Sequence, residues 1–120
     1  ARFLRLMDDG SYAEAAVAGS ELVELTRAEF GAGSIRLATP LANLGTAQLR
    51  AGDVAGAEAS YQAAVDLIED LEGILSRRLE NPLLGLGEAY MRSERYPQAT
   101  ATYERALRVS QVSEGLYNLE

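Results

Sequence analysis

Apolar residues recur along this chain at intervals of three and four positions, the spacing that places side chains on one buried face of an α-helix. The pattern predicts helices over residues 1–7, 11–30, 40–50, 53–72 and 82–93, and a last helix after a turn at 94–95. The positions expected to face the interior are Tyr12, Ala15, Ala16, Gly19, Leu22, Val23, Thr26, Leu41, Leu44, Gly45, Gln48, Leu49, Ala57, Tyr61, Ala64, Val65, Ile68, Leu71, Leu83, Leu86, Gly87, Tyr90, Met91, Ala99, Tyr103, Ala106 and Leu107.

Local signals predict where the first helices end and begin. Asp8-Asp9-Gly10 ends the first helix, because glycine readily takes the left-handed conformation of a helix stop. Ser11 stands three residues before Glu14, the arrangement of a capping box, in which each side chain accepts a hydrogen bond from the other residue's free backbone N–H. Asp53 follows a tight turn and is expected to cap the helix behind it.

Two later helices share a different start signal, a capping residue followed by proline. Thr39 precedes Pro40 and Asn81 precedes Pro82, and proline fits the first helical position because it has no N–H to leave unpaired. Between them, residues 74–80 are compatible with helix, so either a continued helix or a short separate turn is expected there.

The sequence repeats itself at an interval of 42 residues. Aligning 34–75 with 76–117 needs no gap and gives 15 identities in 42 positions. The large apolar identities fill the space between helices, and the Gly and Ala identities allow two backbones to approach closely, which offsets the cost of about 1 kcal/mol for glycine inside a helix. The identical positions are Ser34, Arg36, Leu37, Pro40, Leu41, Leu44, Gly45, Ala47, Arg50, Ala57, Ala59, Tyr61, Ala64, Glu72 and Gly73.

These residues resemble the tetratricopeptide repeat family, in the elongated 42-residue form seen in kinesin light chains and many bacterial repeat proteins. The matching positions are Leu44-Gly45, Leu86-Gly87 and Tyr90 on the first helices, and Gly52, Ala57, Tyr61, Ala64, Tyr96, Ala99, Tyr103 and Ala106 on the second. The chain departs from the family pattern at Gln48, which replaces an aromatic residue, at Glu94, which replaces the turn glycine, and at Pro40 and Pro82, which shorten the first helices.

The resemblance implies an all-α fold in which antiparallel helix–turn–helix units stack as a right-handed α-solenoid. The expected units are a partial repeat over 1–33, repeats over 34–75 and 76–117, and the start of a further unit at 118–120. The first helices would line a concave groove for a peptide or protein segment. Catalysis, a cofactor and a metal are not expected.

Projecting the outer side of the first helices onto this groove selects its candidate residues. They are Thr39, Asn43, Thr46 and Arg50 in one repeat, and Asn81, Leu84, Glu88 and Arg92 in the next. Asn43 can both donate to and accept from a peptide backbone, and the two arginines can hold a carboxylate.

Simpler interpretations stand beside each candidate. Glu88 and Arg92 are spaced i, i+4 and also form a favourable solvated pair, and Asn43 also fits a plain surface residue. The two-lysine carboxylate clamp of some repeats in this family is absent, because Ala42 and Thr46 stand at the matching positions. A chaperone-tail receptor is therefore disfavoured.

Composition narrows the chemistry further. All 11 basic residues are arginine, against 18 Asp and Glu, and the net charge of −7 disfavours nucleic acid and anionic membranes as partners. Cysteine, histidine and lysine do not occur, which removes thiolate and imidazole chemistry, the Walker phosphate loop and Schiff bases. No apolar run approaches the 18 residues of a membrane span.

Weaker candidates have ordinary explanations. Asp66, Glu69 and Asp70 could hold a divalent cation, yet a charged run on a helix is usually a solvated face. Gly85-Leu86-Gly87 lies inside a predicted helix, so it is not a dinucleotide-binding fingerprint. The repeated tyrosines are more often core than a platform for stacking bases.

Two functions follow, with an enzyme as the weakest third. The chain is expected to be a protein–protein interaction scaffold with an unidentified partner, or alternatively a structural segment that stacks on further repeats or on a second copy. Its first residue is Ala1, without an initiating Met, so a processed chain or a piece of a longer one is expected, in the cytoplasm or, after loss of a signal peptide, in the periplasm. Apolar ends at Phe3–Met7 and Leu116–Leu119 predict self-association or marginal stability.

Overall fold

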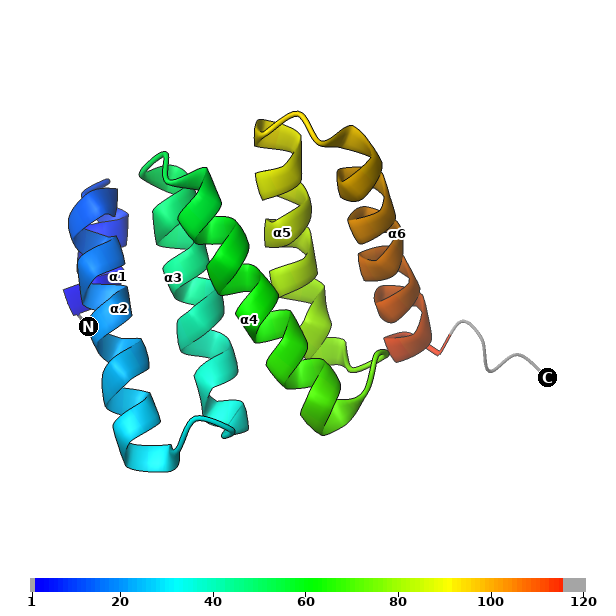
Figure 1. Ribbon diagram of the computed structural model, residues 1–120, viewed down its shortest axis with the longest axis horizontal. Coiled ribbons are helices and arrows are strands. Elements are labelled where there is room, and N and C mark those ends of the chain that lie inside the picture. Colours follow the sequence, from blue (N-terminus) through cyan, green and yellow to red (C-terminus); the bar gives the residue numbers. More distant parts are fainter. Residues whose placement is uncertain (1, 116–120) are drawn as a thin grey trace.

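A computed structural model describes residues 2–115 of the chain, and over this range the protein is all-α, with six α-helices and no strand. The helices are α1 (Arg2–Asp8), α2 (Tyr12–Phe30), α3 (Ala38–Arg50), α4 (Val54–Glu72), α5 (Glu80–Arg92) and α6 (Tyr96–Ser113). Each is antiparallel to its neighbours in the chain (Figure 1). The expected all-α fold of helical hairpins is confirmed, while the further unit predicted at 118–120 and the apolar end at 116–119 lie outside the described residues.

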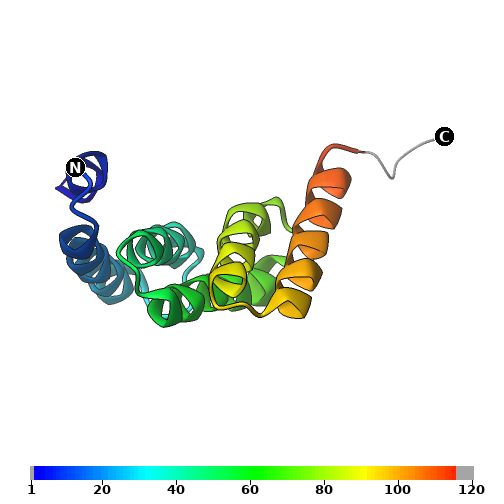
Figure 2. The same cartoon turned by 90° about the horizontal axis from the view of Figure 1, so that it is seen from above.

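The helices form two rows that bend into a shallow arc. Helices α1, α3 and α5 lie along its inner side, and α2 and α4 along its outer side (Figure 2). The molecule measures 49 × 35 × 22 Å along its principal axes. The first helix of each hairpin therefore lies on the concave face, as the resemblance to tetratricopeptide repeats implies.

Two α-helices begin earlier than the sequence predicts. Helices α3 and α5 start at Ala38 and Glu80, each directly after a turn of 3₁₀ helix, η1 (Ile35–Leu37) and η2 (Arg77–Leu79). Thr39 and Asn81 are therefore inside their helices and do not cap them. The short separate turn, one of the two alternatives for residues 74–80, is confirmed by η2.

Serine side chains organise both 3₁₀ turns. The Ser34 hydroxyl accepts a hydrogen bond from the Arg36 N–H at 3.1 Å, and the Ser76 hydroxyl accepts one from the Arg78 N–H at 3.2 Å. Of the other predicted caps, Asp53 is confirmed, since its side chain accepts from the Gly56 N–H at 2.9 Å. The capping box is wrong: Ser11 precedes α2, but its side chain makes no capping hydrogen bond.

The core fills the space between consecutive hairpins. Val65 and Ile68 of α4 pack against Leu79 and Leu83 at the start of the next hairpin, and each of the four is at most 1% exposed. Burying a side chain of this size stabilises the fold by about 1.5–3 kcal/mol. Stacking of α4 against α5 is therefore a major source of stability.

The small residues of the repeat make the close contacts predicted for them. Ala57 and Ala64 are fully buried, and Ala99 and Ala106 are at most 4% exposed. A Cβ added to Gly45 would stand 3.0 Å from the Tyr61 ring. A Cβ added to Gly87 would stand 2.6 Å from the ring of Tyr103. Each first-helix glycine thus makes room for the tyrosine of its own hairpin.

Several positions predicted to be interior are exposed. Leu22, Leu71, Met91 and Leu107 have 45%, 51%, 45% and 58% of their surface exposed, and Tyr103 has 36%. Neighbouring helices leave these side chains partly uncovered within residues 2–115, although the Tyr103 ring still contacts Gly87 of α5. The apolar end predicted at Phe3–Met7 is confirmed at Leu4, which is 63% exposed, and wrong at Phe3, which is buried.

Candidate functional site

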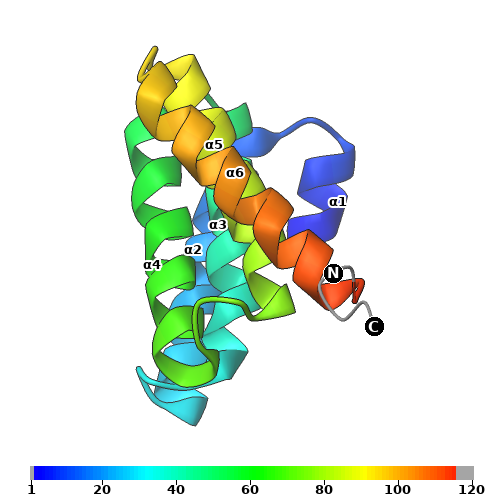
Figure 3. The same cartoon turned by 90° about the vertical axis from the view of Figure 1, so that its right-hand side faces the viewer.

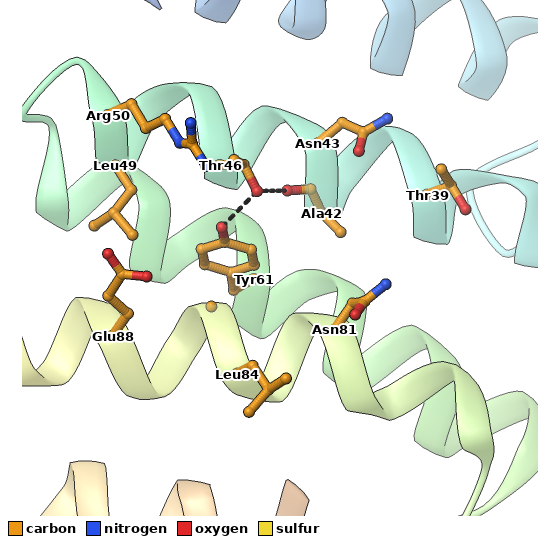
Figure 4. Close-up of a pocket in the computed structure, with 11 residues that line it drawn as sticks. Thr39, Ala42, Asn43, Thr46, Leu49, Arg50, Tyr61, Asn81, Leu84 and Glu88 are labelled. Atoms are coloured by element: carbon orange, nitrogen blue, oxygen red, sulfur yellow. Dashed lines mark hydrogen bonds between the residues drawn. The ribbon is translucent and has the colours of Figure 1, made fainter. Parts of the chain in front are cut away.

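A groove runs between α3 and α5 on the concave face, with a side chain of α4 as its floor (Figure 4). Its volume is about 340 Å³. The residues that line it are Thr39, Ala42, Asn43, Thr46, Leu49, Arg50, Tyr61, Asn81, Leu84, Gly85 and Glu88.

All of the predicted groove residues except one contribute to this lining. Thr39, Asn43, Thr46 and Arg50 recur every three or four residues, so they share one face of α3. Asn81, Leu84 and Glu88 share the facing side of α5 in the same way (Figure 4). The structure therefore brings together residues from two repeats that are separated by more than 30 positions in the chain.

Arg92 lies outside the groove lining and binds within the protein. Its guanidinium donates to the Leu49 carbonyl oxygen at 2.9 Å, which ties α5 to the end of α3. It also donates to the Glu88 carboxylate at 2.9 Å, so the predicted i, i+4 ion pair is confirmed. The contact with Leu49 fixes the position of Arg92, and the ion pair in turn orients Glu88 at the groove edge. The guanidinium of Arg92 is therefore already engaged within the protein.

Tyr61 forms the floor and is held from three sides. Gly45 lies against one part of its ring and Gly85 against another, and the side chain is only 4% exposed. Its hydroxyl shares a hydrogen bond of 2.7 Å with the Thr46 hydroxyl, which donates in turn to the Ala42 carbonyl oxygen at 3.2 Å. The floor is thus a fixed aromatic ring with a polar edge.

Burial sets the titration of this tyrosine. Desolvation raises the pKa of the Tyr61 hydroxyl, and the charge of Glu88 raises it further. The hydrogen bond to Thr46 and the positive charges of Arg50 and Arg92 act in the opposite direction. The net shift is upward, so the floor presents a neutral phenol at neutral pH.

The groove walls carry polar groups that the protein itself does not use. Within residues 2–115, the side chains of Thr39, Asn43 and Asn81 make no hydrogen bond, and all three are exposed. Arg50 makes no ion pair in this range; its guanidinium lies 5.9 Å from the Tyr12 ring centroid, a weak cation–π contact. Two amides and one guanidinium without an ion-pair partner among residues 2–115 therefore line the groove.

Sequence reasoning missed the floor of the groove and the residues that define it. Tyr61 was expected only as core, and Gly85 only as part of a rejected nucleotide motif. A Cβ on Gly85 would stand 2.2 Å from the Tyr61 ring. A glycine inside a helix costs about 1 kcal/mol, so Gly85 within a predicted helix could have indicated a close contact at that position. The comparison of the two repeats did not select it, because the equivalent position of the earlier repeat is Asn43.

The acidic run on α4 makes ordinary surface contacts. Asp66 accepts a hydrogen bond from Gln62 at 2.9 Å, and Glu69 pairs with Arg105 of α6. Among residues 2–115, no group of three or more acidic side chains is placed to hold a metal ion. None of the helices described is both long and apolar enough to cross a membrane.

Comparison with known proteins supports one part of the chain directly. No curated protein matches the sequence. A family model described as a tetratricopeptide repeat matches residues 83–111, which run from the first turns of α5 through most of α6. Residues 83–111 therefore form a tetratricopeptide repeat.

Proposed function

We propose that this chain is a protein–protein interaction scaffold that binds an extended peptide or protein segment in the groove between α3 and α5. A tetratricopeptide repeat in general implies such a scaffold and is typically non-catalytic, and no enzyme family matches the chain. The observation that carries the proposal is the convergence of Asn43, Asn81 and Arg50, all without hydrogen-bond or ion-pair partners in the part of the chain described, on one groove.

The chemistry of these groups suits a peptide. An amide side chain donates and accepts at once, so Asn43 and Asn81 can pair with a peptide's backbone N–H and C=O groups whatever its sequence. Arg50 offers a planar guanidinium that binds a carboxylate through two parallel hydrogen bonds. An extended segment with an acidic side chain or a free C-terminus near Arg50 is the ligand that these groups favour.

A peptide array tests this assignment. The chain is applied to immobilised peptides that carry free or amidated C-termini, and the affinity of each hit is measured in solution. Arg50→Ala is expected to weaken carboxylate-bearing hits about 10- to 100-fold, since a hydrogen bond to a charged group contributes about 1.5–3 kcal/mol. Asn43→Ala is expected to weaken all hits about 5-fold, consistent with a neutral hydrogen bond of about 1 kcal/mol.

Arg77→Ala is the matched control, because Arg77 is exposed on η2, away from the groove lining. It is expected to leave binding unchanged. Hits that bind Arg50→Ala and Asn43→Ala as tightly as the unaltered chain would overturn the groove assignment. An array without hits would overturn the proposal for short peptides.

A further inference from the structure

A second hollow lies between α2, the end of α3 and the turn that leads into α4. Its volume is about 410 Å³. Its lining includes Ala16, Val17, Leu44, Gln48, Ala51 and Asp53, and it shares no residue with the groove between α3 and α5. Helices α2 and α4 form the outer row of the arc (Figure 2), and a view along the row of helices places α4 on the side opposite α1 (Figure 3).

The repeat contains a counterpart of this hollow, between α4 and the turn from α5 to α6, and there the chain fills the space itself. Arg95 of the turn forms an ion pair with Glu58 of α4. Its guanidinium lies 4.7 Å from the centre of the Tyr90 ring and donates to the Ser93 hydroxyl at 3.2 Å. An arginine side chain thus bridges the two hairpins.

All four residues of this bridge are replaced in the earlier copy by shorter side chains. The residues that stand 42 positions before Glu58, Tyr90, Ser93 and Arg95 are Ala16, Gln48, Ala51 and Asp53. The shorter side chains leave the space open. The last replacement also reverses the charge, because the carboxylate of Asp53 stands where the bridge has its guanidinium.

Further repeats would not close the hollow. Both of its walls and the hairpin that follows them lie within the described residues, and the hollow is open in their presence. At the counterpart, the side chains of Arg95 and Glu58 keep 41% and 29% of their surface exposed, although the hairpin of α1 and α2 precedes them. A hairpin before α1 would stand in the same relation to the hollow and leave it accessible.

We propose that this hollow binds an arginine side chain of another protein, whose guanidinium pairs with Asp53. The occupant takes the place that Arg95 fills in the counterpart. Val17 and Leu44 offer apolar surface to the methylene groups of the arginine, while its charged head stays at the rim.

The charge of the lining favours a cation over a purely apolar side chain. Asp53 makes no ion pair within residues 2–115. It accepts a hydrogen bond from the Gly56 N–H at 2.9 Å, but a carboxylate has about four lone-pair sites and can accept from a guanidinium as well. The net charge of −7 also attracts a basic partner. This site is independent of the groove between α3 and α5, where Arg50 favours a carboxylate.

A short peptide tests the proposal with a defined probe. Acetyl-Ala-Arg-Ala-amide is titrated into the isotope-labelled chain, and proton–nitrogen correlation NMR spectra report which residues it perturbs. The perturbed signals are expected to be those of the hollow, and Asp53→Asn is expected to weaken binding about 2- to 5-fold, the range of an exposed ion pair. Asparagine also caps helices, so α4 keeps its cap. Asp70→Asn is the matched control, since Asp70 is exposed on α4 outside the lining, and it is expected to leave binding unchanged.

The same peptide with citrulline in place of arginine supplies the second comparison. It keeps the shape of arginine without the charge, so it is expected to bind the unaltered chain about 2- to 5-fold more weakly and to be insensitive to Asp53→Asn. Ala16→Glu combined with Asp53→Arg transfers the bridge of Glu58 and Arg95 into the hollow, and it is expected to abolish binding of the arginine peptide.

Three results would each overturn the proposal. They are equal binding of the arginine and citrulline peptides, equal binding to the unaltered chain and Asp53→Asn, and the absence of perturbed signals at the hollow. Continued binding to a folded double variant would contradict it too; if that variant does not fold, the first two comparisons decide. Asn43→Ala and Arg50→Ala are expected to leave binding of this probe intact, so failure of the groove proposal remains distinguishable.

Discussion

Replacing Gly85 with alanine tests the contact that joins the two complete hairpins. The added Cβ would stand 2.2 Å from Cζ and 2.4 Å from Cε1 of Tyr61. The ring has little room to retreat, because a Cβ built on Gly45 would stand only 3.0 Å from it on α3. The hydroxyl is held by its 2.7 Å hydrogen bond to Thr46. The substitution therefore forces either the tyrosine or helix α5 to move.

The expected cost follows from three effects. An extra carbon in a packed interior costs about 1–3 kcal/mol through displaced side chains and backbone. Loss of the hydrogen bond between Tyr61 and Thr46 costs about 1 kcal/mol more. Alanine is favoured over glycine inside a helix by about 1 kcal/mol, which offsets part of this. Gly85→Ala is thus expected to lower the free energy of unfolding by about 1–3 kcal/mol.

Urea unfolding followed by circular dichroism measures this change, provided that the slope against urea stays constant. The decisive comparison repeats Gly85→Ala in a Tyr61→Val background, where the ring is absent. There the substitution is expected to stabilise the protein by about 1 kcal/mol, because only the helix preference remains. The coupling between the two sites should therefore be about 2–4 kcal/mol. A Gly85→Ala variant as stable as the unaltered chain, with no coupling, would refute the packing of α5 over Tyr61.

Two further predictions concern a turn and a titration. Glu94 has a positive φ of 61°, at the position equivalent to Gly10 and Gly52, whose φ values are 77° and 91°. Because a positive φ is unfavourable for a residue with a side chain, Glu94→Gly is expected to raise the free energy of unfolding by about 0.5–1 kcal/mol. Thermal and urea unfolding measure this change. A lower stability would show that the turn carries no strain. Because burial raises the pKa of Tyr61 above its ordinary value of about 10, the folded state holds the phenolic proton more tightly than the unfolded chain. The contribution of this shift to stability is complete below pH ~10 and falls as the pH rises through the folded-state pKa. Tyr61→Phe is therefore expected to reduce the loss of stability between about pH 9 and 11. An unchanged slope of the free energy of unfolding against pH would contradict this.

The helix starts show which local signals a sequence leaves ambiguous. Pro40 and Pro82 occupy the third residue of α3 and α5, not the first. The first four N–H groups of any helix lack an intrahelical acceptor, so proline is tolerated throughout the first turn. The dipeptides Thr39-Pro40 and Asn81-Pro82 therefore located the first turn correctly but did not fix its first residue. The serines of the 3₁₀ turns carried that information.

The burial errors have a different cause. Periodicity identifies the apolar face of a helix, but the width of the face that is covered depends on how many helices pack against it. Helix α4 is packed between α3 and α5, so Val65 is fully buried. Its equivalent on α6, Leu107, is 58% exposed, since α5 is its principal neighbour. For the groove, projecting the helix faces correctly placed Asn43 and Asn81 on one surface. The same projection could not predict that Arg92 bonds to the Leu49 carbonyl and to Glu88, because these contacts depend on side-chain geometry.

The first hairpin keeps a contact between the two helices that the later hairpins also have, although it does not share the residues that make it. In the two complete repeats, a glycine on the first helix contacts a tyrosine on the second, as Gly45 contacts Tyr61. At the equivalent positions of the first hairpin the partners are exchanged: Phe3 stands on α1 and Gly19 on α2, and a Cβ on Gly19 would stand 3.2 Å from the Phe3 ring. The contact between helices persists although neither residue is conserved between the units.

The exchange changes what reaches the concave surface. Tyr61 extends from the second helix between α3 and α5, where its hydroxyl meets Thr46 and gives the groove floor a polar edge. Phe3 fills the equivalent contact from the first helix and has no hydroxyl to offer. A polar floor of this kind therefore depends on having the tyrosine on the second helix, and the groove between α3 and α5 has it. In the proposed complex, contacts with the peptide are therefore expected to centre on Tyr61 and its neighbours, not on the surface over α1.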